Sequence, residues 1–321
     1  MKISVITACL NRVQLVGEMV ESVLAQQYEP FEYVIIDGGS TDGTLDLLKR
    51  YAHLKVFSGP DRGVYDGFNK GLERVSGEII LFLNSDDLLV PGVFAICADI
   101  FRNTLGTMIV SGGCQIFRRL TDGREIVLHD YRDPRRYALS LRNMSLGLPI
   151  INARVFRRKV FDQIGGFDLR YRISADRHLL IRAALKGIAD APVPKIFYRY
   201  RWHQESLTMN RGNESLLQGI KENEQMIDEL IETRTLIPEQ LRCLHSWRRE
   251  CVGTEVMIHA VQKRPFEAIR TAIRGFQADP PFSLTLLRVG LLAVGRRIRT
   301  WYRSLPRYPR LGTPSGSGDC P

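Results

Sequence analysis

The chain has 321 residues, 44% of them apolar, and a net charge of +10. This apolar fraction is enough to bury a full core, which excludes an intrinsically disordered protein. The six cysteines show neither a CxxC pair nor regular spacing, so they indicate neither a zinc site nor a disulfide framework and favour a reducing, cytosolic setting.

The apolar stretch that begins at Ile3 is too short for a signal peptide, and Asn11-Arg12 ends it. No segment reaches the roughly 18 uncharged apolar residues of a membrane-spanning helix. We therefore expect a cytoplasmic protein that is not integral to a membrane.

From residue 1 to about residue 110, short runs rich in β-branched residues alternate with helical patterns. This alternation predicts a parallel sheet with crossover helices. The expected strands cover residues 3–7, 33–36, 55–57, 78–83 and 108–110, and the expected helices cover residues 13–27, 44–51, 64–74 and 93–101.

Residues 111–150 are polar, irregular and rich in arginine, which suits a loop-rich or small antiparallel insertion. After about residue 211 the pattern becomes helical, and the Gly-, Pro- and Ser-rich end, residues 312–321, is expected to be disordered. Between these parts we expect helices over residues 155–163 and 177–186 and a strand over residues 196–200.

Polar side chains stand at the ends of the expected strands. Thr7 ends the first strand, Asp37 follows the second, and Asp86 and Asp87 follow the apolar run 79–83. Because the carboxyl ends of parallel strands meet at one sheet edge, where open α/β sheets bind ligands, we expect these side chains to gather. Neighbouring carboxylates repel unless a cation compensates, and their oxygens suit a hard divalent ion that also binds substrate phosphates.

Helix capping is the alternative explanation of the acidic pair. Ser85 or one of the two aspartates can cap a helix that is entered through Pro91, and Asp is common at such starts. For the pair alone, capping and metal binding have similar weight. The polar residues at three strand ends together are harder to explain by capping.

Four linked motifs closely resemble those of family 2 glycosyltransferases of the GT-A fold. The order, spacing and residue types agree, and the resemblance covers roughly residues 1–210. The motifs are YVIIDGGSTDGT at residues 33–44, PDRGVYDGFNKG at 60–71, GEIILFLNSDD at 77–87, and the acceptor-side segments GGFD at 165–168 and SADRHLLIR at 174–182.

The resemblance implies an α/β fold in which helices flank a mixed, mainly parallel, Rossmann-like sheet. Residues 1–210 would form the catalytic domain, with residues 1–110 as its nucleotide-sugar-binding half and residues 111–210 as its acceptor-side half. Residues 211–311 would form a helical, basic C-terminal region.

The resemblance also implies a donor site. Thr7 and Asp37 would contact the nucleotide base, and a carboxylate such as Asp37 suits the N–H groups of a base. Asp86 and Asp87 would hold a divalent cation, Mn²⁺ or Mg²⁺, on the donor diphosphate, where it neutralises the charge of the leaving group. Asp87 is the expected direct metal ligand, with Asp86 nearer the ribose or sugar of the donor.

Three basic residues are candidates for the same site. Arg62 and Lys70 can supplement the metal at the phosphates, and Arg62 suits a bidentate grip. An Arg or Lys in such a loop is more often simply solvated. His203 falls where some GT-A enzymes supply a metal-ligating His, although a lone His is more often a satisfied polar group.

Asp176 resembles the catalytic base of the family. A sugar hydroxyl is a poor nucleophile at neutral pH, so a carboxylate within hydrogen-bond reach must take its proton as it attacks the anomeric carbon. The alternative is that Ser174 or Asp176 only caps the following helix. Two departures from the family pattern concern Asp37-Gly38, where many members have two acidic residues, and Asn152-Ala153, where relatives often carry His-Gln.

The expected activity is a metal-dependent, inverting glycosyltransferase of the hexosyltransferase type. It would move a sugar from a nucleotide-diphosphate sugar, more specifically a UDP-sugar, to a hydroxyl of a glycan or lipid-linked acceptor in cell-surface polysaccharide biosynthesis. The alternatives are a nucleotide-sugar-binding protein of the same fold without turnover and a nucleotidyltransferase. The first loop lacks the Gly-rich, basic character that a triphosphate needs, which disfavours the nucleotidyltransferase.

The basic excess gathers near the carboxyl end. Residues 282–310 contain seven arginines and no Asp or Glu, interleaved with apolar residues. This pattern predicts an amphipathic helix on an anionic membrane surface rather than a nucleic-acid-binding segment, which would make the protein peripheral on the inner face of the cytoplasmic membrane. Packing of the apolar stripe on the catalytic domain is the alternative.

Overall fold

The computed structural model of the protein describes residues 1–203 and 214–278. The predicted basic segment 282–310 and the predicted disordered end 312–321 lie outside the described residues. The chain divides into one compact unit, Met1–Cys251, and a second that starts at Val252.

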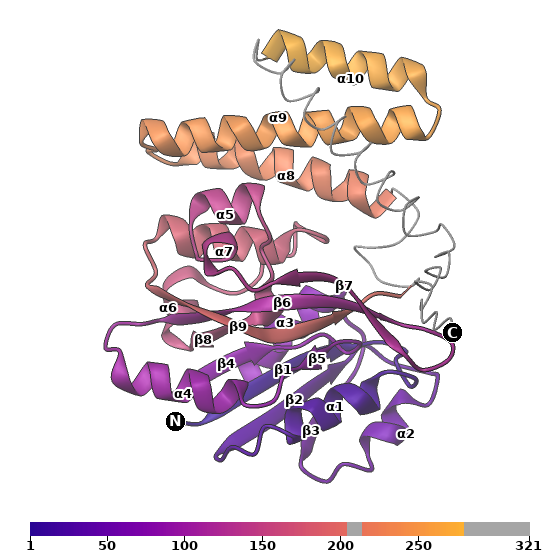
Figure 1. Ribbon diagram of the computed structural model, residues 1–321, viewed down its shortest axis with the longest axis vertical. Helices are drawn as coiled ribbons and strands as arrows, with labels where there is room; N and C mark the ends of the chain where they lie inside the picture. Colours follow the sequence, from indigo (N-terminus) through magenta and orange to yellow (C-terminus); the bar gives the residue numbers. More distant parts are fainter. Residues whose placement is uncertain (204–213, 279–321) are drawn as a thin grey trace, which may run out of the picture. The chain divides into compact units, whose positions relative to one another are not determined.

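The first unit contains a sheet and the helices that flank it (Figure 1). Its strands are β1 (Ile3–Cys9), β2 (Phe31–Asp37), β3 (Leu54–Ser58), β4 (Ile79–Phe82), β5 (Leu88–Leu89), β6 (Ile109–Arg119), β7 (Glu125–Tyr131), β8 (Arg154–Arg157) and β9 (Asp190–Arg201). Its helices are α1 (Val16–Leu24), α2 (Thr44–Leu48), α3 (Val64–Arg74), α4 (Val93–Asn103), α5 (Leu141–Leu146), α6 (Lys159–Ile164), α7 (Ala175–Leu185) and α8 (Glu214–Thr233), with short 3₁₀ turns at Pro134–Arg136 and Ile151–Ala153.

The sheet is mixed, in the order β3-β2-β1-β4-β8-β6-β9-β5, and β7 pairs with β6. The first four strands in this order are parallel, β8 runs antiparallel to both β4 and β6, and β6 and β9 are parallel. The architecture therefore has two halves. Strands from residues before 83 form the parallel half, and strands from later residues form the mixed half.

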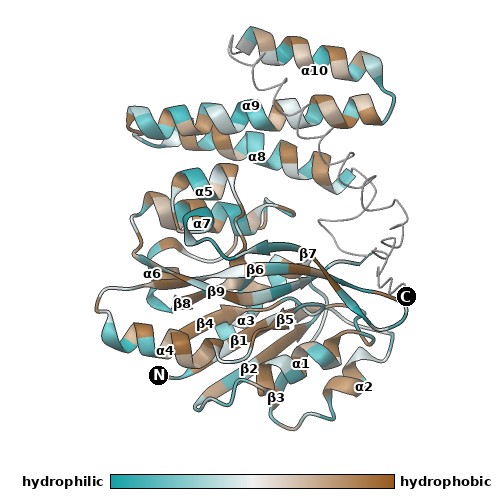
Figure 2. Ribbon diagram, in the orientation of Figure 1, coloured by the Kyte–Doolittle hydropathy of each residue, from teal (hydrophilic) through white to brown (hydrophobic). Residues whose placement is uncertain are grey.

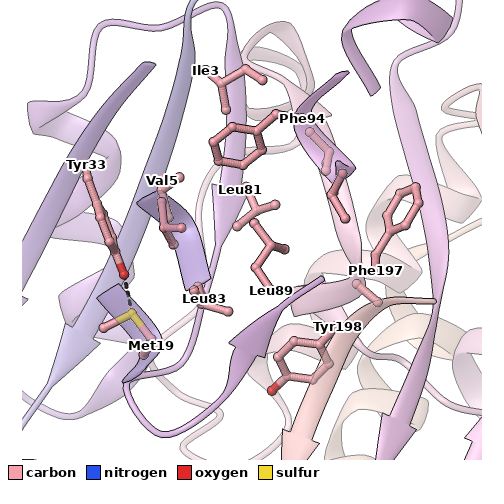
Figure 3. Close-up of a cluster of buried hydrophobic side chains, with 14 of the residues drawn as sticks. Ile3, Val5, Met19, Tyr33, Leu81, Leu83, Leu89, Phe94, Phe197 and Tyr198 are labelled. Atoms are coloured by element: carbon pink, nitrogen blue, oxygen red, sulfur yellow. Dashed lines mark hydrogen bonds between the residues drawn. The ribbon is translucent and has the colours of Figure 1, made fainter. Parts of the chain in front are cut away.

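The core lies along the central strands. Every residue of β1 is buried, as expected for a strand covered on both faces. Figure 3 shows Val5, Leu81 and Leu83 of the parallel half close to Leu89 and Phe94, which come from the next segment of the chain. Figure 2 shows hydrophobic colour concentrated on β2 and α4, both of which contribute buried side chains to this cluster.

Helix prediction failed for the first residues of the segment 155–163. Residues 154–157 form β8, and the helix α6 starts only at Lys159. Val155 and Phe156 are buried and lie between β4 and β6, where Val155 is paired with both Leu81 and Val110. Burial and pairing on both sides favour the extended form of β-branched and aromatic residues over a helical pattern.

The insertion expected within residues 111–150 contains a β-hairpin. β6 continues to Arg119 and pairs antiparallel with β7, whose outer residues Ile126 and Val127 are exposed. The antiparallel form that the sequence predicted is thus present, although its first strand belongs to the main sheet.

The C-terminal helices begin within the first unit. The sequence suggested a boundary near residue 210, but α8 and the part of α9 (Pro238–Val261) up to Cys251 still belong to the first unit. The second unit begins with the last turns of α9 and includes α10 (Pro265–Ala278), where Val252 and Val256 pack against Ala268 and Ala272. In residues 1–203 and 214–278, no helix combines the length and the apolar character needed to cross a membrane.

Candidate active site

The carboxyl edge of the parallel strands collects the predicted donor-site residues. β1 lies between β2 and β4, and Cys9 at the end of β1 is paired with Asp37 at the end of β2. The segment Asn84–Asp87 follows β4 at the same edge. The sequence prediction that these strand ends meet is therefore confirmed by the strand order.

The carboxylate of Asp37 is fully buried and organises the turn that follows β2. Its Oδ2 accepts hydrogen bonds from the backbone N–H groups of Gly39 and Ser40, both at 3.0 Å, and from the Ser58 hydroxyl at 2.7 Å. Burial raises the pKa of Asp37, but these hydrogen bonds outweigh burial and hold the pKa below its usual value. The carboxylate is thus ionised and fixed at the sheet edge. Its contact with a nucleotide base remains a prediction.

The side chain of Thr7 points into the core. Its hydroxyl lies 2.9 Å from the Tyr33 hydroxyl and 3.8 Å from the sulfur of Met19, and the residue has no exposed surface. Figure 3 shows the Tyr33 hydroxyl meeting the sulfur of Met19 within the same cluster. The structure therefore does not bring the Thr7 hydroxyl to the other candidates, and its contact with a base remains a prediction.

Asp87 is the inner member of the acidic pair, with 1% of its surface exposed. Its carboxylate accepts hydrogen bonds from the Arg201 backbone N–H at 2.6 Å, from the Asn84 amide at 3.1 Å and from the Tyr198 hydroxyl. Burial, followed by the negative charge of Asp86, raises the pKa of Asp87 well above its usual range. A positive charge at this position would relieve both effects.

Asp86 is the outer member of the pair. Its Oδ2 lies 2.9 Å from Nε2 of His203 and 3.9 Å from Nε of Arg12, and about a fifth of each of these three side chains is exposed. The structure thus brings His203 to the acidic pair, as the sequence predicted, although five strands and several helices separate them in the chain order.

Arg201 fixes the loop that carries both aspartates. In addition to its backbone bond to Asp87, its guanidinium donates through Nε to the backbone carbonyl of Asp86 at 3.0 Å and through a terminal nitrogen to Glu18 at 2.9 Å. The side chain is 95% buried, since only 5% of it is exposed. Sequence reasoning missed Arg201 and Tyr198. Tyr198 belongs to the predicted strand 196–200 and Arg201 follows it directly, but no local pattern in that run reports their contacts with the distant acidic pair.

Asn152 occupies one of the two positions that depart from the family pattern. Its side-chain amide is buried and donates to the Phe82 carbonyl and to the Asn84 side chain, both at 3.3 Å. Because Asn84 in turn donates to Asp87, Asn152 supports the acidic pair from behind. The departure thus replaces the usual residue with another that has a defined hydrogen-bonding role.

Arg62 and Lys70 meet at a different carboxylate, that of Asp66. Lys70 lies 2.9 Å from Asp66 and also donates to the Pro60 carbonyl at 2.8 Å, while Arg62 lies 3.3 Å from Asp66 with three quarters of its side chain exposed. Burial raises the pKa of Asp66, and the bonds from Lys70 and Arg62 more than offset this and lower it. The structure places the two cations together, and their contact with phosphates remains a prediction.

Asp176 lies in the first turn of α7. Its Oδ1 accepts the Arg177 backbone N–H at 2.7 Å. The Tyr65 hydroxyl lies beside both the Asp176 carboxylate and the Ile173 carbonyl, the latter at 3.1 Å, so its single proton is shared between these two acceptors. Burial raises the pKa of Asp176 to about 6, against partial lowering by the Arg177 and Tyr65 contacts. A carboxylate with this pKa is ionised at neutral pH and more basic than an ordinary aspartate.

Asn69 ties the second motif, residues 60–71, to the acceptor-side segment. Its side-chain amide donates to the Phe167 carbonyl and its carbonyl accepts the Phe167 N–H, both at 2.8 Å. A Cβ at position 166 would come within 2.4 Å of the Asn69 oxygen, so only glycine allows this close approach. Asp168, which follows Phe167, accepts hydrogen bonds from the backbone N–H and the guanidinium of Arg170.

The described residues provide two metal-ligating groups at this site rather than a complete set of protein ligands. Among residues 1–203 and 214–278, no three His, Cys, Asp or Glu side chains cluster closely enough to hold a metal ion. A carboxylate oxygen of Asp86 and an imidazole nitrogen of His203, 2.9 Å apart at a partly exposed edge, suit a divalent ion whose remaining ligands come from substrate phosphates. The residues present therefore fit a shared cation.

Sequence comparison identifies the family. The family described as "Glycosyl transferase family 2" matches residues 4–165. A PGL/p-HBAD biosynthesis glycosyltransferase of Mycobacterium bovis is 30% identical over 185 residues, which cover 56% of this chain and 68% of the relative. An uncharacterized glycosyltransferase of Nostoc sp. is 26% identical over 234 residues, which cover 69% of this chain and 71% of the relative.

Solved structures share the fold at lower identity. Residues 1–349 of TarS of S. aureus, in complex with UDP-GlcNAc, align with a TM-score of 0.62 and 16% identity over 87% of this chain and 92% of that TarS chain. The mannosyltransferase PcManGT of Pyrobaculum calidifontis, in complex with GDP-Man and Mn²⁺, aligns with a TM-score of 0.59 and 20% identity over 94% of this chain and 83% of the neighbour. Together with the mixed sheet, these likenesses confirm the predicted GT-A fold. The chain belongs to glycosyl transferase family 2.

Proposed function

We propose that this glycosyltransferase transfers a sugar from a UDP-sugar to a hydroxyl of a glycan or lipid-linked acceptor in a single inverting displacement. The observation that carries the proposal is Asp176, a carboxylate with a pKa raised to about 6 at the start of α7. Its environment gives it the basicity that proton abstraction at neutral pH requires.

In the proposed reaction, Asp176 takes the proton of the acceptor hydroxyl as the oxygen attacks the anomeric carbon. The bond to the nucleoside diphosphate breaks on the opposite face, so the configuration inverts. The Tyr65 hydroxyl contacts the carboxylate and favours its ionised form. Asp37 and the turn it organises would receive the nucleotide base, together with backbone groups near Thr7.

A divalent cation, Mn²⁺ or Mg²⁺, would be held by Asp86 and His203, with Asp87 behind them. When bound, it would neutralise the charge that develops on the leaving diphosphate. We place Asp86 toward the cation rather than Asp87, the direct ligand expected from the sequence, because the Asp87 oxygens already accept bonds from Arg201, Asn84 and Tyr198. Arg62 and Lys70 would add positive charge on the phosphate side.

The wider setting is also proposed. The related mycobacterial protein carries the name of a biosynthesis glycosyltransferase, which supports a role in assembling cell-envelope glycans or lipid-linked sugars as a hexosyltransferase. The arginine-rich sequence of residues 282–310 supports cytoplasmic action at an anionic membrane surface. Vesicle sedimentation with and without residues 282–321 tests this, and unchanged sedimentation on truncation would remove the membrane proposal.

A donor screen followed by one substitution tests the chemistry. With Mn²⁺ present, a matching nucleotide sugar such as UDP-N-acetylglucosamine should raise the melting temperature, because only a ligand bound to the folded state stabilises it. Asp176→Asn should keep this stabilisation and lose transfer by about a hundredfold or more. Asp162→Asn, at an exposed carboxylate of α6, serves as the control and should leave both unchanged.

Three outcomes would contradict the proposal. Unchanged transfer by Asp176→Asn would remove the assignment of the base. Stabilisation by the donor without any release of nucleoside diphosphate would favour a binding protein. Release of pyrophosphate from a nucleoside triphosphate would favour a nucleotidyltransferase.

A further inference from the structure

Glu222 of α8 has an environment that differs from those of the other carboxylates described so far. Only 3% of its surface is exposed, and its two oxygens accept the backbone N–H groups of three consecutive residues, Arg172, Ile173 and Ser174, each at 2.9 Å. Gln218, one turn earlier on α8, donates to the same carboxylate at 3.1 Å. Within residues 1–203 and 214–278 this buried carboxylate is therefore held by three backbone N–H groups and one side-chain amide rather than by an ion pair.

The three amides belong to the segment that leads directly into α7. Ser174 is the N-cap residue of α7, and its own side chain makes no capping bond to the helix. The carboxylate of Glu222 therefore supplies, from another helix, the negative charge that the amino end of α7 favours. Two residues further on stands Asp176, so the first turn that carries the proposed base is positioned by Glu222.

The same segment is held from its other side by α3. Tyr65 donates to the Ile173 carbonyl at 3.1 Å and also contacts Asp176. Glu222 fixes the N–H groups and Tyr65 fixes the carbonyl, so the backbone before α7 has little freedom to move. Close packing adds to this, because a Cβ at Gly219 would come within 3.3 Å of the Ile173 side chain.

We propose that Glu222 is a positioning residue for the transfer reaction, which sets the place of the Asp176 carboxylate through the backbone of residues 172–174. The inference rests on the proposed function, in which Asp176 is the base. It assigns α8, which lies beyond the family's matched region, a role in the reaction. Glu222 itself touches neither donor nor acceptor.

A purely structural role makes a different prediction. If Glu222 only stabilised the fold, its loss would lower the folded fraction and leave the folded molecules fully active. If it positions the base, the folded molecules bind donor normally and turn over slowly. A misplacement of about 1 Å at a reacting group can cost roughly a hundredfold in rate.

The test compares Glu222→Gln with Glu232→Gln. Gln keeps the size of Glu222 but replaces an accepting oxygen by an N–H₂ group that faces the amides, whereas Glu232 is an exposed carboxylate on the same helix. The probe is UDP-N-acetylglucosamine or GDP-mannose with Mn²⁺, whichever stabilises the wild type more. The rate is the release of nucleoside diphosphate, with water in place of the acceptor, normalised to folded protein by circular dichroism.

For Glu222→Gln we expect kcat to fall about 10- to 100-fold while the donor KM and the donor-induced rise in melting temperature change less than twofold. Glu232→Gln should match the wild type in all three. The double variant Glu222→Gln with Asp176→Asn should be no slower than Asp176→Asn alone, because the positioning residue acts only through the base. An equal fall of the rate in both backgrounds, or an unchanged kcat of Glu222→Gln, would overturn the inference.

If Glu222→Gln does not fold, Gln218→Leu replaces it, since this change removes one donor and retains the charge. We then expect kcat to fall about two- to fivefold at unchanged KM, and an unchanged kcat would overturn the inference. Failure of the proposed function gives a distinct result, because the wild type itself would then release no nucleoside diphosphate or Asp176→Asn would retain full activity.

Discussion

The acidic limb of the pH–rate profile should report the ionisation of Asp176. With a pKa of about 6, the ionised fraction of this carboxylate is about 0.99 at pH 8, about 0.5 at pH 6 and about 0.09 at pH 5. We therefore expect the rate to fall roughly elevenfold between pH 8 and pH 5. An ordinary aspartate with a pKa near 3.9 would lose less than about a tenth of its activity over the same range.

The assay is kcat/KM for the donor at saturating Mn²⁺, measured in steps of half a pH unit. Two variants identify the group that titrates. Tyr65→Phe removes a hydrogen bond that favours the ionised carboxylate, so its limb should move to higher pH. His203→Gln should keep the limb at the wild-type position. His178 does not contribute, because burial lowers its pKa to about 4.

The reasoning fails in two cases. A limb near pH 4 would mean that Asp176 is not buried enough to be raised, and a limb that stays in place in Tyr65→Phe would mean that another group titrates. A limb that disappears in His203→Gln would assign it to the metal side of the site rather than to the base.

Three further predictions concern the scaffold and the cation. Asn69→Ala should lower the free energy of unfolding by about 2–4 kcal/mol, because it removes two hydrogen bonds to Phe167 and leaves both backbone groups of Phe167 unsatisfied. The control Asn103→Ala, at an exposed residue, should cost about 0.5 kcal/mol or less. Urea unfolding measures both, and equal unfolding midpoints of the two variants would contradict the role of Asn69. Glu32 is buried against Lys2, Lys55 and backbone amides, and its pKa is strongly lowered because these hydrogen bonds outweigh burial, so it contributes stability above about pH 4.5 that is lost as the pH falls. Glu32→Gln should therefore lower the free energy of unfolding at pH 7 by about 3 kcal/mol and flatten the decline of this free energy between pH 5 and pH 3. An unchanged slope would contradict this. Removal of divalent ions by EDTA should abolish the donor-induced rise in melting temperature and added Mn²⁺ should restore it, while a rise that persists in EDTA would remove the shared cation.

Local patterns made the parallel half of the sheet predictable. The runs at residues 3–7, 33–36 and 78–83 are short, apolar and flanked by turn residues, and each forms a buried strand near its expected bounds. The acidic residues after β2 and β4 could be assigned to one edge because parallel strands end on the same side. These features depend on residues that are neighbours in the sequence, so the sequence of one chain is enough to predict them.

The missed features depend on distant contacts. The strand at Val155 forms because β4 and β6 flank it on both sides. The Thr7 side chain points inward to the Tyr33 hydroxyl of the neighbouring strand β2. Arg201 reaches Asp86 across 115 positions of the chain, and no local periodicity reports such a pairing. Glu222 lies in an ordinary amphipathic helix, so its three backbone bonds leave no signature in the sequence.

The contacts between β9 and the acidic pair can form only late in synthesis, because the ribosome releases the chain from its amino end. Residues 1–87 emerge early and contain the predicted donor-binding residues and both aspartates, but two of the groups that hold Asp87, the Tyr198 hydroxyl and the Arg201 backbone, are synthesised more than a hundred positions later. A nascent chain can thus form the parallel strands while Asp87 lacks these two contacts. The acidic pair reaches its final arrangement only when β9 joins the sheet, so an interrupted translation product that ends before this strand would lack an assembled cation site.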